Sequence, residues 1–109
     1  MKIGIVGSRN ITEINIEQYV FDCDEIVSGG AVGVDRLAAE YAQKTGIVLV
    51  EFLPQYELYG RAAPIVRNKQ IVDYADKIVA FWDEKSKGTL LVIRYARKVG
   101  KPCDVIICN

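Results

Sequence analysis

The stretch SGGAVGVDRLA, residues 28–38, lies between a short apolar run and a run with helical spacing. Glycine adopts positive φ angles and, having no Cβ atom, lets the backbone approach a ligand closely. We expect Gly29, Gly30 and Gly33 to turn the chain from a buried strand into a helix. The free amides at a helix start carry partial positive charge, which suits a phosphate. A tight turn that binds nothing is an equal alternative, because glycines alone do not separate the two.

Short apolar runs at residues 3–6, 25–27, 47–52, 77–81 and 105–107 predict five strands. Each run is almost continuously apolar, which is typical of parallel strands covered on both faces. Helical spacing of apolar residues begins near Ile16, Val34, Ile65 and Val92. This alternation predicts one α/β domain over residues 1–109. We expect a Rossmann-like, doubly wound sheet of five parallel strands in the order 3-2-1-4-5, with helices on both faces.

The composition excludes several classes of protein. The 109 residues include 14 basic and 14 acidic side chains, a balance that argues against broad binding to duplex DNA or anionic membranes. Histidine is absent, which excludes Ser-His-Asp and Cys-His catalysis. Cys23, Cys103 and Cys108 lack the spacing of a zinc site and suit a reduced protein. No apolar stretch is long enough for a membrane span. We therefore expect a cytoplasmic protein without a metal or cofactor.

Two further polar loops are predicted to lie beside the glycine turn. The stretch GSRN, residues 7–10, follows the first strand, and DEKSKGT, residues 83–89, follows the fourth. With the strand order 3-2-1-4-5, the loops after strands one, two and four meet at the carboxyl edge of the sheet. Arg9 and Lys87 would supply positive charge there. The hydroxyls of Ser8, Ser86 and Thr89 would donate to phosphate oxygens, and Thr89 has a compatible alternative role as a helix cap.

Three stretches resemble the SLOG superfamily of Rossmann-like domains: residues 28–38, RNKQIVDYAD at 67–76, and FWDEKSKGTLLVIRYARKVGKP at 81–102. The match is closest to small stand-alone members, and the superfamily binds nucleotides and nucleotide derivatives. The resemblance implies that this chain does so too, as a sensor or accessory protein. It implies ligand contacts from Gly29, Gly30, Gly33, Asp35, Arg67, Asn68, Lys87, Gly88 and Thr89. The argument from the loops adds Gly7, Ser8, Arg9, Ser28 and Ser86.

Several of these residues have alternative roles when they are judged by position alone. Arg67 and Asn68 follow a long loop, residues 53–64, and their position alone indicates a solvent-exposed helix start. Only the resemblance favours contact with a ligand. Asp35 either opposes a helix dipole or accepts a hydrogen bond from a ribose hydroxyl. Tyr56 and Tyr59 either stack on a base or pin the long loop to the domain.

Catalysis is the first alternative to simple binding. The Lonely-Guy phosphoribohydrolases of the same superfamily use a glutamate tied to a PGGxGTxxE loop. Apolar residues 91–93 stand where that glutamate should follow, so the resemblance does not supply the catalytic residue. A nucleotide N-glycosidase or phosphoribohydrolase would have to use Asp35, Asp83 or Glu84 instead.

Two macromolecular partners also follow from the resemblance. In the DNA-processing protein A family the corresponding segments contact single-stranded DNA, which makes single-stranded nucleic acid a second alternative ligand. Val32 stands where those proteins usually carry arginine, a departure that weighs against DNA. Related domains commonly pair, and Tyr74, Trp82 and Tyr95 offer apolar area, so we expect a homo-oligomer.

Overall fold

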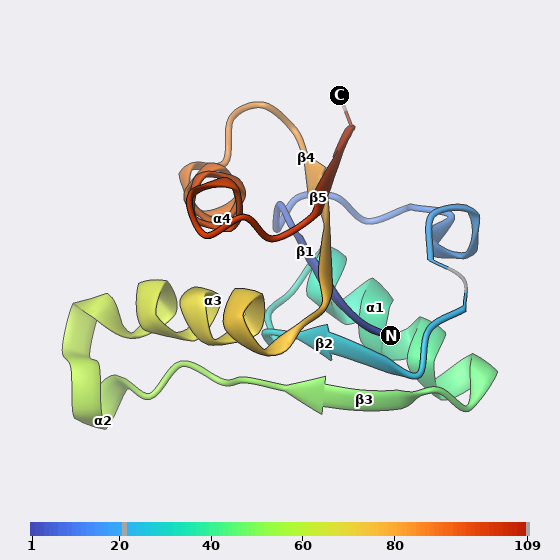
Figure 1. The fold of residues 1–109 in the computed structure, drawn as a ribbon, viewed down its shortest axis with the longest axis horizontal. Helices are drawn as coiled ribbons and strands as arrows, with labels where there is room; N and C mark the ends of the chain where they lie inside the picture. The colour runs from blue at the N-terminus through green and yellow to red at the C-terminus, as the bar shows by residue number, and fades with distance from the viewer. Residues whose placement is uncertain (21, 109) are drawn as a thin grey trace.

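The computed structural model describes residues 1–20 and 22–108. Its strands form one parallel sheet in the order β3-β2-β1-β4-β5, which confirms the predicted topology (Figure 1). The strands are β1 (Lys2–Gly7), β2 (Glu25–Ser28), β3 (Val48–Glu51), β4 (Lys77–Trp82) and β5 (Cys103–Ile107). The central strands β1, β2 and β4 are buried almost throughout, as their continuous apolar runs predict.

Helices cover both faces of this sheet. The helical elements are α1 (Val34–Thr45), α2 (Tyr56–Tyr59), α3 (Ala63–Tyr74) and α4 (Lys87–Lys98), with two 3-10 turns, η1 (Ile16–Gln18) and η2 (Gly60–Ala62). One core cluster joins Ile5 and Phe81 of the sheet to Val34 of α1. A second cluster joins Val27 of the sheet to side chains of α3 and α4. The helix α1 and the η1 segment therefore cover one face, and α3 and α4 cover the other (Figure 1).

Two expectations about the connections are wrong. The helical face predicted from Ile16 forms only the 3-10 turn η1, because β-branched residues and asparagines crowd the segment and weaken its helix propensity. Ile11, Ile16 and Val20 still reach the core from this irregular chain. The long loop expected at residues 53–64 contains α2 and η2, and α3 begins at Ala63 with Pro64 in its first turn.

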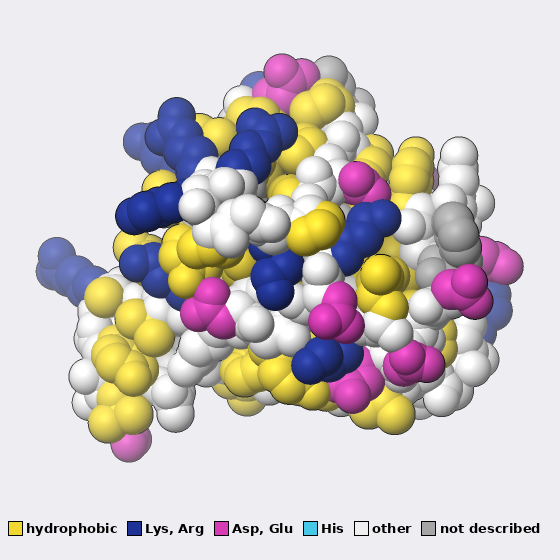
Figure 2. All heavy atoms as spheres, in the orientation of Figure 1, with side chains coloured by type: hydrophobic (Ala, Val, Ile, Leu, Met, Phe, Trp, Pro, Cys, Tyr) yellow, Lys and Arg dark blue, Asp and Glu magenta, His cyan; other side chains and the backbone are white. Residues whose placement is uncertain are grey.

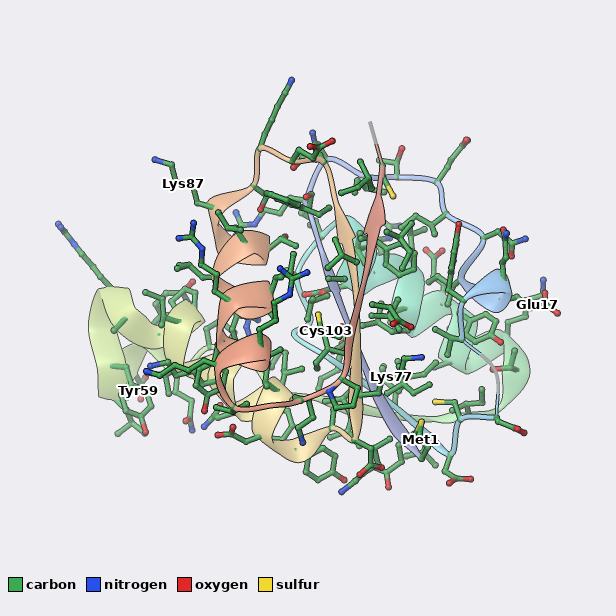
Figure 3. All side chains as sticks on the ribbon, turned by 45° about the horizontal axis from the view of Figure 1, so that its top comes forward. Met1, Glu17, Tyr59, Lys77, Lys87 and Cys103 are labelled. Carbon is green, nitrogen blue, oxygen red and sulfur yellow. The ribbon has the colours of Figure 1, made fainter. Side chains whose placement is uncertain are left out.

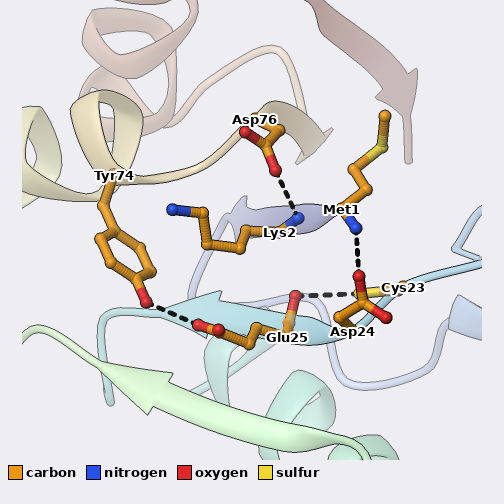
Figure 4. A network of polar contacts seen from close by, with 7 residues as sticks. All are labelled: Met1, Lys2, Cys23, Asp24, Glu25, Tyr74 and Asp76. Carbon is orange, nitrogen blue, oxygen red and sulfur yellow. Dashed lines mark hydrogen bonds and ion pairs between the residues drawn. The ribbon is translucent and has the colours of Figure 1, made fainter.

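Polar contacts tie the strands together at the amino edge of the sheet (Figure 4). The backbone amide of Lys2 donates to Asp76 Oδ2 at 2.7 Å, and Tyr74 Oη donates to Glu25 Oε1 at 2.6 Å. The Lys2 Nζ atom also lies 4.1 Å from the centre of the Tyr74 ring. These contacts hold the starts of β1, β2 and β4 in place. The loops at the opposite, carboxyl edge of the sheet do not take part in them and are available to contact a ligand.

Within the described residues, no helix combines the length and the apolar character needed to cross a membrane. Cys23, Cys103 and Cys108 are free thiols and are half-buried. They pack against the edges of the two core clusters, as expected for small apolar residues.

Candidate functional site

A pocket of about 430 Å³ lies at the carboxyl edge of the sheet, and we call it the edge pocket. Its size falls within the range of about 300–1,000 Å³ that is typical of small-molecule sites. It is lined by Val6, Gly7, Ser8, Arg9, Asn10, Ala31, Asp35, Pro64, Arg67, Asn68, Ile71, Ser86, Gly88, Thr89 and Val92. These residues come from the loops after β1, β2 and β4 and from α3, so three loops that the sequence predicts as neighbours share one pocket.

The edge pocket brings together most of the predicted site residues. Those that line it are Gly7, Ser8, Arg9, Asp35, Arg67, Asn68, Ser86, Gly88 and Thr89. Ser28, Gly29, Gly30, Gly33 and Lys87 are predicted site residues that do not line it. Among the lining residues that sequence reasoning missed are Asn10, at the end of a loop already singled out, and Val92, one helical turn after Gly88. Their positions next to predicted residues were the available signal.

The glycine turn supports the pocket from behind. Gly33 begins α1 with φ 74°, and a Cβ atom at this position would overlap the backbone of Arg9. Gly30 has φ 70°, and a Cβ there would lie 2.5 Å from Leu53 Cδ2, on the side of the loop after β3. Gly33 is therefore required by its packing against the Arg9 backbone, and Gly30 by its positive φ. A Cβ at Gly30 would strain the turn rather than occupy the pocket.

Arg67 is the most buried basic residue of the site, with 8% of its surface exposed. The alternative role as a solvated helix start is wrong for Arg67, because α3 begins four residues earlier and places Arg67 over the end of β2. Its Nη1 atom donates to the carbonyl oxygen of Gly29 at 2.5 Å, and its Nε atom donates to Asn68 Oδ1 at 2.8 Å. A Cβ at Gly29 would lie 2.5 Å from Nη1, so glycine is needed to admit the guanidinium.

Asp35 faces Arg67 across Gly29. The two charged groups lie 2.5 and 3.0 Å from the position that a Gly29 Cβ would take, and therefore within about 5.5 Å of each other. Burial raises the pKa of the Asp35 carboxyl; the Ala31 amide, which donates to Oδ2 at 3.1 Å, and the Arg67 charge partly oppose that rise. The hydroxyl of Ser28 also lowers this pKa slightly, although its buried Oγ atom makes no hydrogen bond of ordinary geometry.

The first turn of α4 faces the edge pocket. Ser86 caps the helix, because its Oγ atom accepts a hydrogen bond from the Thr89 amide at 3.3 Å, so the cap is Ser86 and not Thr89 as the alternative role proposed. The Thr89 hydroxyl lies 3.1 Å from Ser86 Oγ. The amides of Lys87 and Gly88 belong to the first turn, where an α-helix offers no internal acceptor. These two amides are available to an anion.

Asp83 holds the loop that leads into α4. Its Oδ1 atom accepts hydrogen bonds from the amides of Ser86 at 2.8 Å and Lys85 at 2.9 Å, and from the Ser8 hydroxyl at 3.0 Å. The two amides, and then the Ser8 hydroxyl, lower the pKa of Asp83 to about 2. This carboxylate is therefore ionised at neutral pH. It ties the end of β1 to the start of α4.

The basic side chains of the carboxyl-terminal half gather on one side of the molecule. Residues 61–101 contain ten Lys or Arg and four Asp or Glu, although the whole chain is balanced. Figure 2 shows Lys and Arg side chains clustered over α4. Lys87 is exposed and extends away from the body of the protein at the start of this helix (Figure 3). Lys87, a predicted site residue, thus adds positive charge near the pocket without lining it. The equal numbers of acidic and basic residues in the whole chain gave no indication of this basic side.

Of the three carboxylates considered for catalysis, only Asp35 lines the edge pocket. Asp83 borders a separate hollow with Asn10 and Lys85, and Glu84 is exposed on the same loop with φ 65°. The described part of the chain holds no group of three or more His, Cys, Asp or Glu side chains placed to bind a metal ion.

Comparison of the chain with protein families, with curated proteins and with solved structures finds no match.

Proposed function

We propose that the protein binds a nucleotide or nucleotide derivative in the edge pocket, as a sensor or accessory protein. The phosphate would lie against the first turn of α4, where the amides of Lys87 and Gly88 and the partial positive charge of the helix favour an anion. Arg9, which is exposed at the rim of the pocket, would approach the phosphate from the opposite loop.

Gly88 carries this proposal. Gly29, Gly30 and Gly33 are explained by neighbouring atoms of the protein, but a Cβ at Gly88 would meet no atom within 4 Å. The position lies inside a helix, where glycine is less stable than alanine by up to about 1 kcal/mol. Gly88 also lies four residues before Val92, so a side chain there would project toward the pocket that both residues line. No neighbouring protein atom explains a glycine at position 88. A phosphate in contact with the backbone there would explain it, because a Cβ atom would block that contact.

The nucleoside would lie toward α3 and α1. Asn68 lines the pocket half-buried, and its amide group both donates and accepts hydrogen bonds, as recognition of a base edge requires. Its Oδ1 atom already accepts from Arg67, which leaves the NH₂ group to donate. The Asp35 carboxylate would accept from a ribose hydroxyl, and such a bond offsets part of the cost of its burial.

The experiment compares nucleotide binding to the wild-type protein and to Gly88→Ala by calorimetry. The panel of ligands tested comprises mononucleotides, ADP-ribose and cyclic dinucleotides. Lys87→Ala, on the neighbouring residue, is the matched control variant. We expect Gly88→Ala to bind at least tenfold more weakly while its melting temperature stays equal or rises. Lys87→Ala should weaken binding less, because that side chain points outward. Equal affinity of Gly88→Ala and wild type would overturn the placement of the phosphate.

Hydrolysis of the bound nucleotide has one residue in its favour, Asp35, whose pKa is raised by burial beside the pocket. A raised pKa suits a general acid. The same calorimetry samples answer this question when they are assayed for released base. Release that disappears in Asp35→Asn, with binding retained, would make the protein a nucleotide N-glycosidase or phosphoribohydrolase.

Single-stranded nucleic acid is the second candidate, and the basic side over α4 favours it (Figure 2). A strand that entered the edge pocket would continue along Lys87, Arg94 and Lys98, which are exposed on this helix. A labelled oligonucleotide whose binding weakens steeply with salt would support this candidate. Binding of mononucleotides alone would exclude it.

A further inference from the structure

A short apolar arm projects from the end of the molecule. It comprises residues 53–60 and includes α2, whose main contacts within the described residues are with α3 and the turn η2 (Figure 1). Tyr56, Leu58 and Tyr59 expose 58, 69 and 43% of their surface, and Leu53 exposes 58%. Figure 2 shows hydrophobic side chains gathered at the lower left corner of the surface, where α2 lies in Figure 1. Soluble proteins seldom leave such a cluster uncovered.

Of the three aromatic residues expected to drive self-association, Tyr95 lines a groove between α3 and α4, whereas Tyr74 and Trp82 already make contacts within the protein. Tyr74 packs edge-on against Phe52, with ring centres 5.5 Å apart, and bonds to Glu25. Trp82 is half-buried, and its Nε1 atom donates to the carbonyl oxygen of Ser86 at 3.0 Å. The arm therefore exposes more apolar surface than Tyr74 or Trp82, and it carries Tyr56 and Tyr59, for which the sequence left base stacking and loop pinning as alternatives.

A groove of about 310 Å³ between α3 and α4 lies near the arm on the same side of the molecule. Ile65 and Leu91, exposed to 46 and 45%, give it apolar walls together with the ring of Tyr95. Lys69, Arg94 and Lys98 form its rim. No ion pair within the described residues neutralises these three cations. Lys69 Nζ lies 5.5 Å from the centre of the Tyr95 ring, and Tyr95 Oη donates to Asp73 Oδ1 at 2.8 Å, so Arg94 and Lys98 are the basic groups of the groove without a partner among the described ion pairs and ring contacts.

The arm and the groove have complementary chemistry. Glu57 is the only charged residue of the arm, and it stands between Tyr56 and Leu58. An arm from a second copy would bring two apolar side chains to the groove and one carboxylate to its basic rim. The protein's own arm extends from the start of α3 away from the sheet (Figure 1), so it leaves its own groove open.

We propose that two copies of this chain pair by exchanging arms, each arm entering the α3–α4 groove of the other copy. A two-fold axis makes the two contacts equivalent and closes the assembly as a dimer. The three most exposed side chains of α2 offer on the order of 300 Å² per arm. Two arms and two grooves together bury on the order of 1,000 Å², near the lower limit for specific interfaces. The dimer should therefore be weak and reversible, with a dissociation constant on the order of micromolar.

Sedimentation velocity from about 1 to 500 μM tests the pairing. Wild type should shift from monomer to dimer over this range, and Leu58→Asp should remain monomeric with a nearly unchanged melting temperature, because Leu58 is 69% exposed and has little buried surface to lose. Glu57→Arg and Arg94→Glu should each weaken pairing several-fold. The double variant should recover most of the loss, because it restores opposite charges across the contact. Lys44→Glu, at the end of α1, is the control that should change nothing.

Three results would overturn the proposal: a wild-type monomer at every concentration, a dimer that tolerates Leu58→Asp, or a double variant no better than the sum of its single changes. If wild type is monomeric and Arg94→Glu instead loses binding to a labelled oligonucleotide, the groove serves a polyanion. Nucleotide affinity is also measured on the Leu58→Asp variant, which should be monomeric. Unchanged affinity there would show that pairing and the proposed nucleotide binding can fail independently.

Discussion

Replacing Arg67 with alanine should destabilise the fold strongly, although Arg67 looks from its sequence position like an exposed helix residue. Arg67 is 8% exposed, and its guanidinium donates to the carbonyl oxygen of Gly29 at 2.5 Å. A hydrogen bond from a charged donor contributes about 1.5–3 kcal/mol. The lost charge also faces the buried Asp35 carboxylate. Opposite charges at about 5.5 Å, the largest separation that the geometry at Gly29 allows, attract by roughly 3 kcal/mol at an effective dielectric constant of about 20, before desolvation is subtracted.

The expected loss in the free energy of unfolding is about 3–5 kcal/mol, as for other buried charge pairs from which one partner is removed. The melting temperature should fall by roughly 15 °C for a chain of this size. Urea unfolding followed by the fluorescence of Trp82, the single tryptophan, measures the loss directly. Arg36→Ala is the matched control. Arg36 is exposed and pairs with Glu40 at 3.3 Å on the surface of α1, so its loss should change stability by about 0.5 kcal/mol or less.

The pH dependence of the loss separates its two causes. Burial already raises the pKa of Asp35, and removal of Arg67 should raise it further, because the Arg67 charge lowers it. A carboxyl whose pKa is raised in the folded state destabilises that state at high pH, and the penalty disappears as the pH falls and the group is protonated. The deficit of Arg67→Ala should therefore shrink as the pH is lowered from neutral and Asp35 becomes protonated. A loss below 1 kcal/mol that does not vary with pH would refute this account.

Three further changes probe the loops around the pocket. Gly33→Ala should cost at least about 1–2 kcal/mol, because φ is 74° and a Cβ would overlap the Arg9 backbone; an unfolding curve identical to wild type would contradict this. Ser86→Ala should cost about 0.5–2 kcal/mol by removing the cap of α4, and Ser86→Asn should restore part of it. Wild type should lose stability as the pH falls from about 4 to about 2, because the pKa of Asp83 is lowered from 3.8 to about 2; Asp83→Asn should show a smaller acid-induced loss in the same titration.

Much of the architecture is predictable from the sequence because buried parallel strands require continuous apolar runs. The runs around Ile5, Val27 and Val79 predicted three of the strands, and their alternation with helices left few topologies, among them the observed order 3-2-1-4-5. The segment around Ile16 was mispredicted because three apolar residues at helical spacing also suit an irregular chain packed on the core.

Within the site, prediction succeeded for loops and failed for contacts across the molecule. Three loops meet at one edge as strand order requires, so Ser8, Asp35 and Thr89 were predicted as site residues and line the pocket. The burial of Arg67 depends on where α3 begins and on its reach to Gly29, 38 residues away in the chain. Local spacing contains no information about that contact. Gly33 is a second example of a contact that local sequence does not reveal. The sequence indicated that it contacts phosphate, whereas the structure shows that glycine is needed there because the Arg9 backbone lies close by.

The most direct test of the proposed function is a map of backbone amide chemical shifts during titration with nucleotides. We expect the largest changes on the amides of Lys87 and Gly88, with smaller changes in residues 7–10 and at Asn68. Those segments line or border one pocket but lie far apart in the chain. Saturating changes confined to another surface, such as the amino edge around Glu25, would contradict the assignment. So would a spectrum that stays unchanged for every nucleotide in the panel at millimolar concentration.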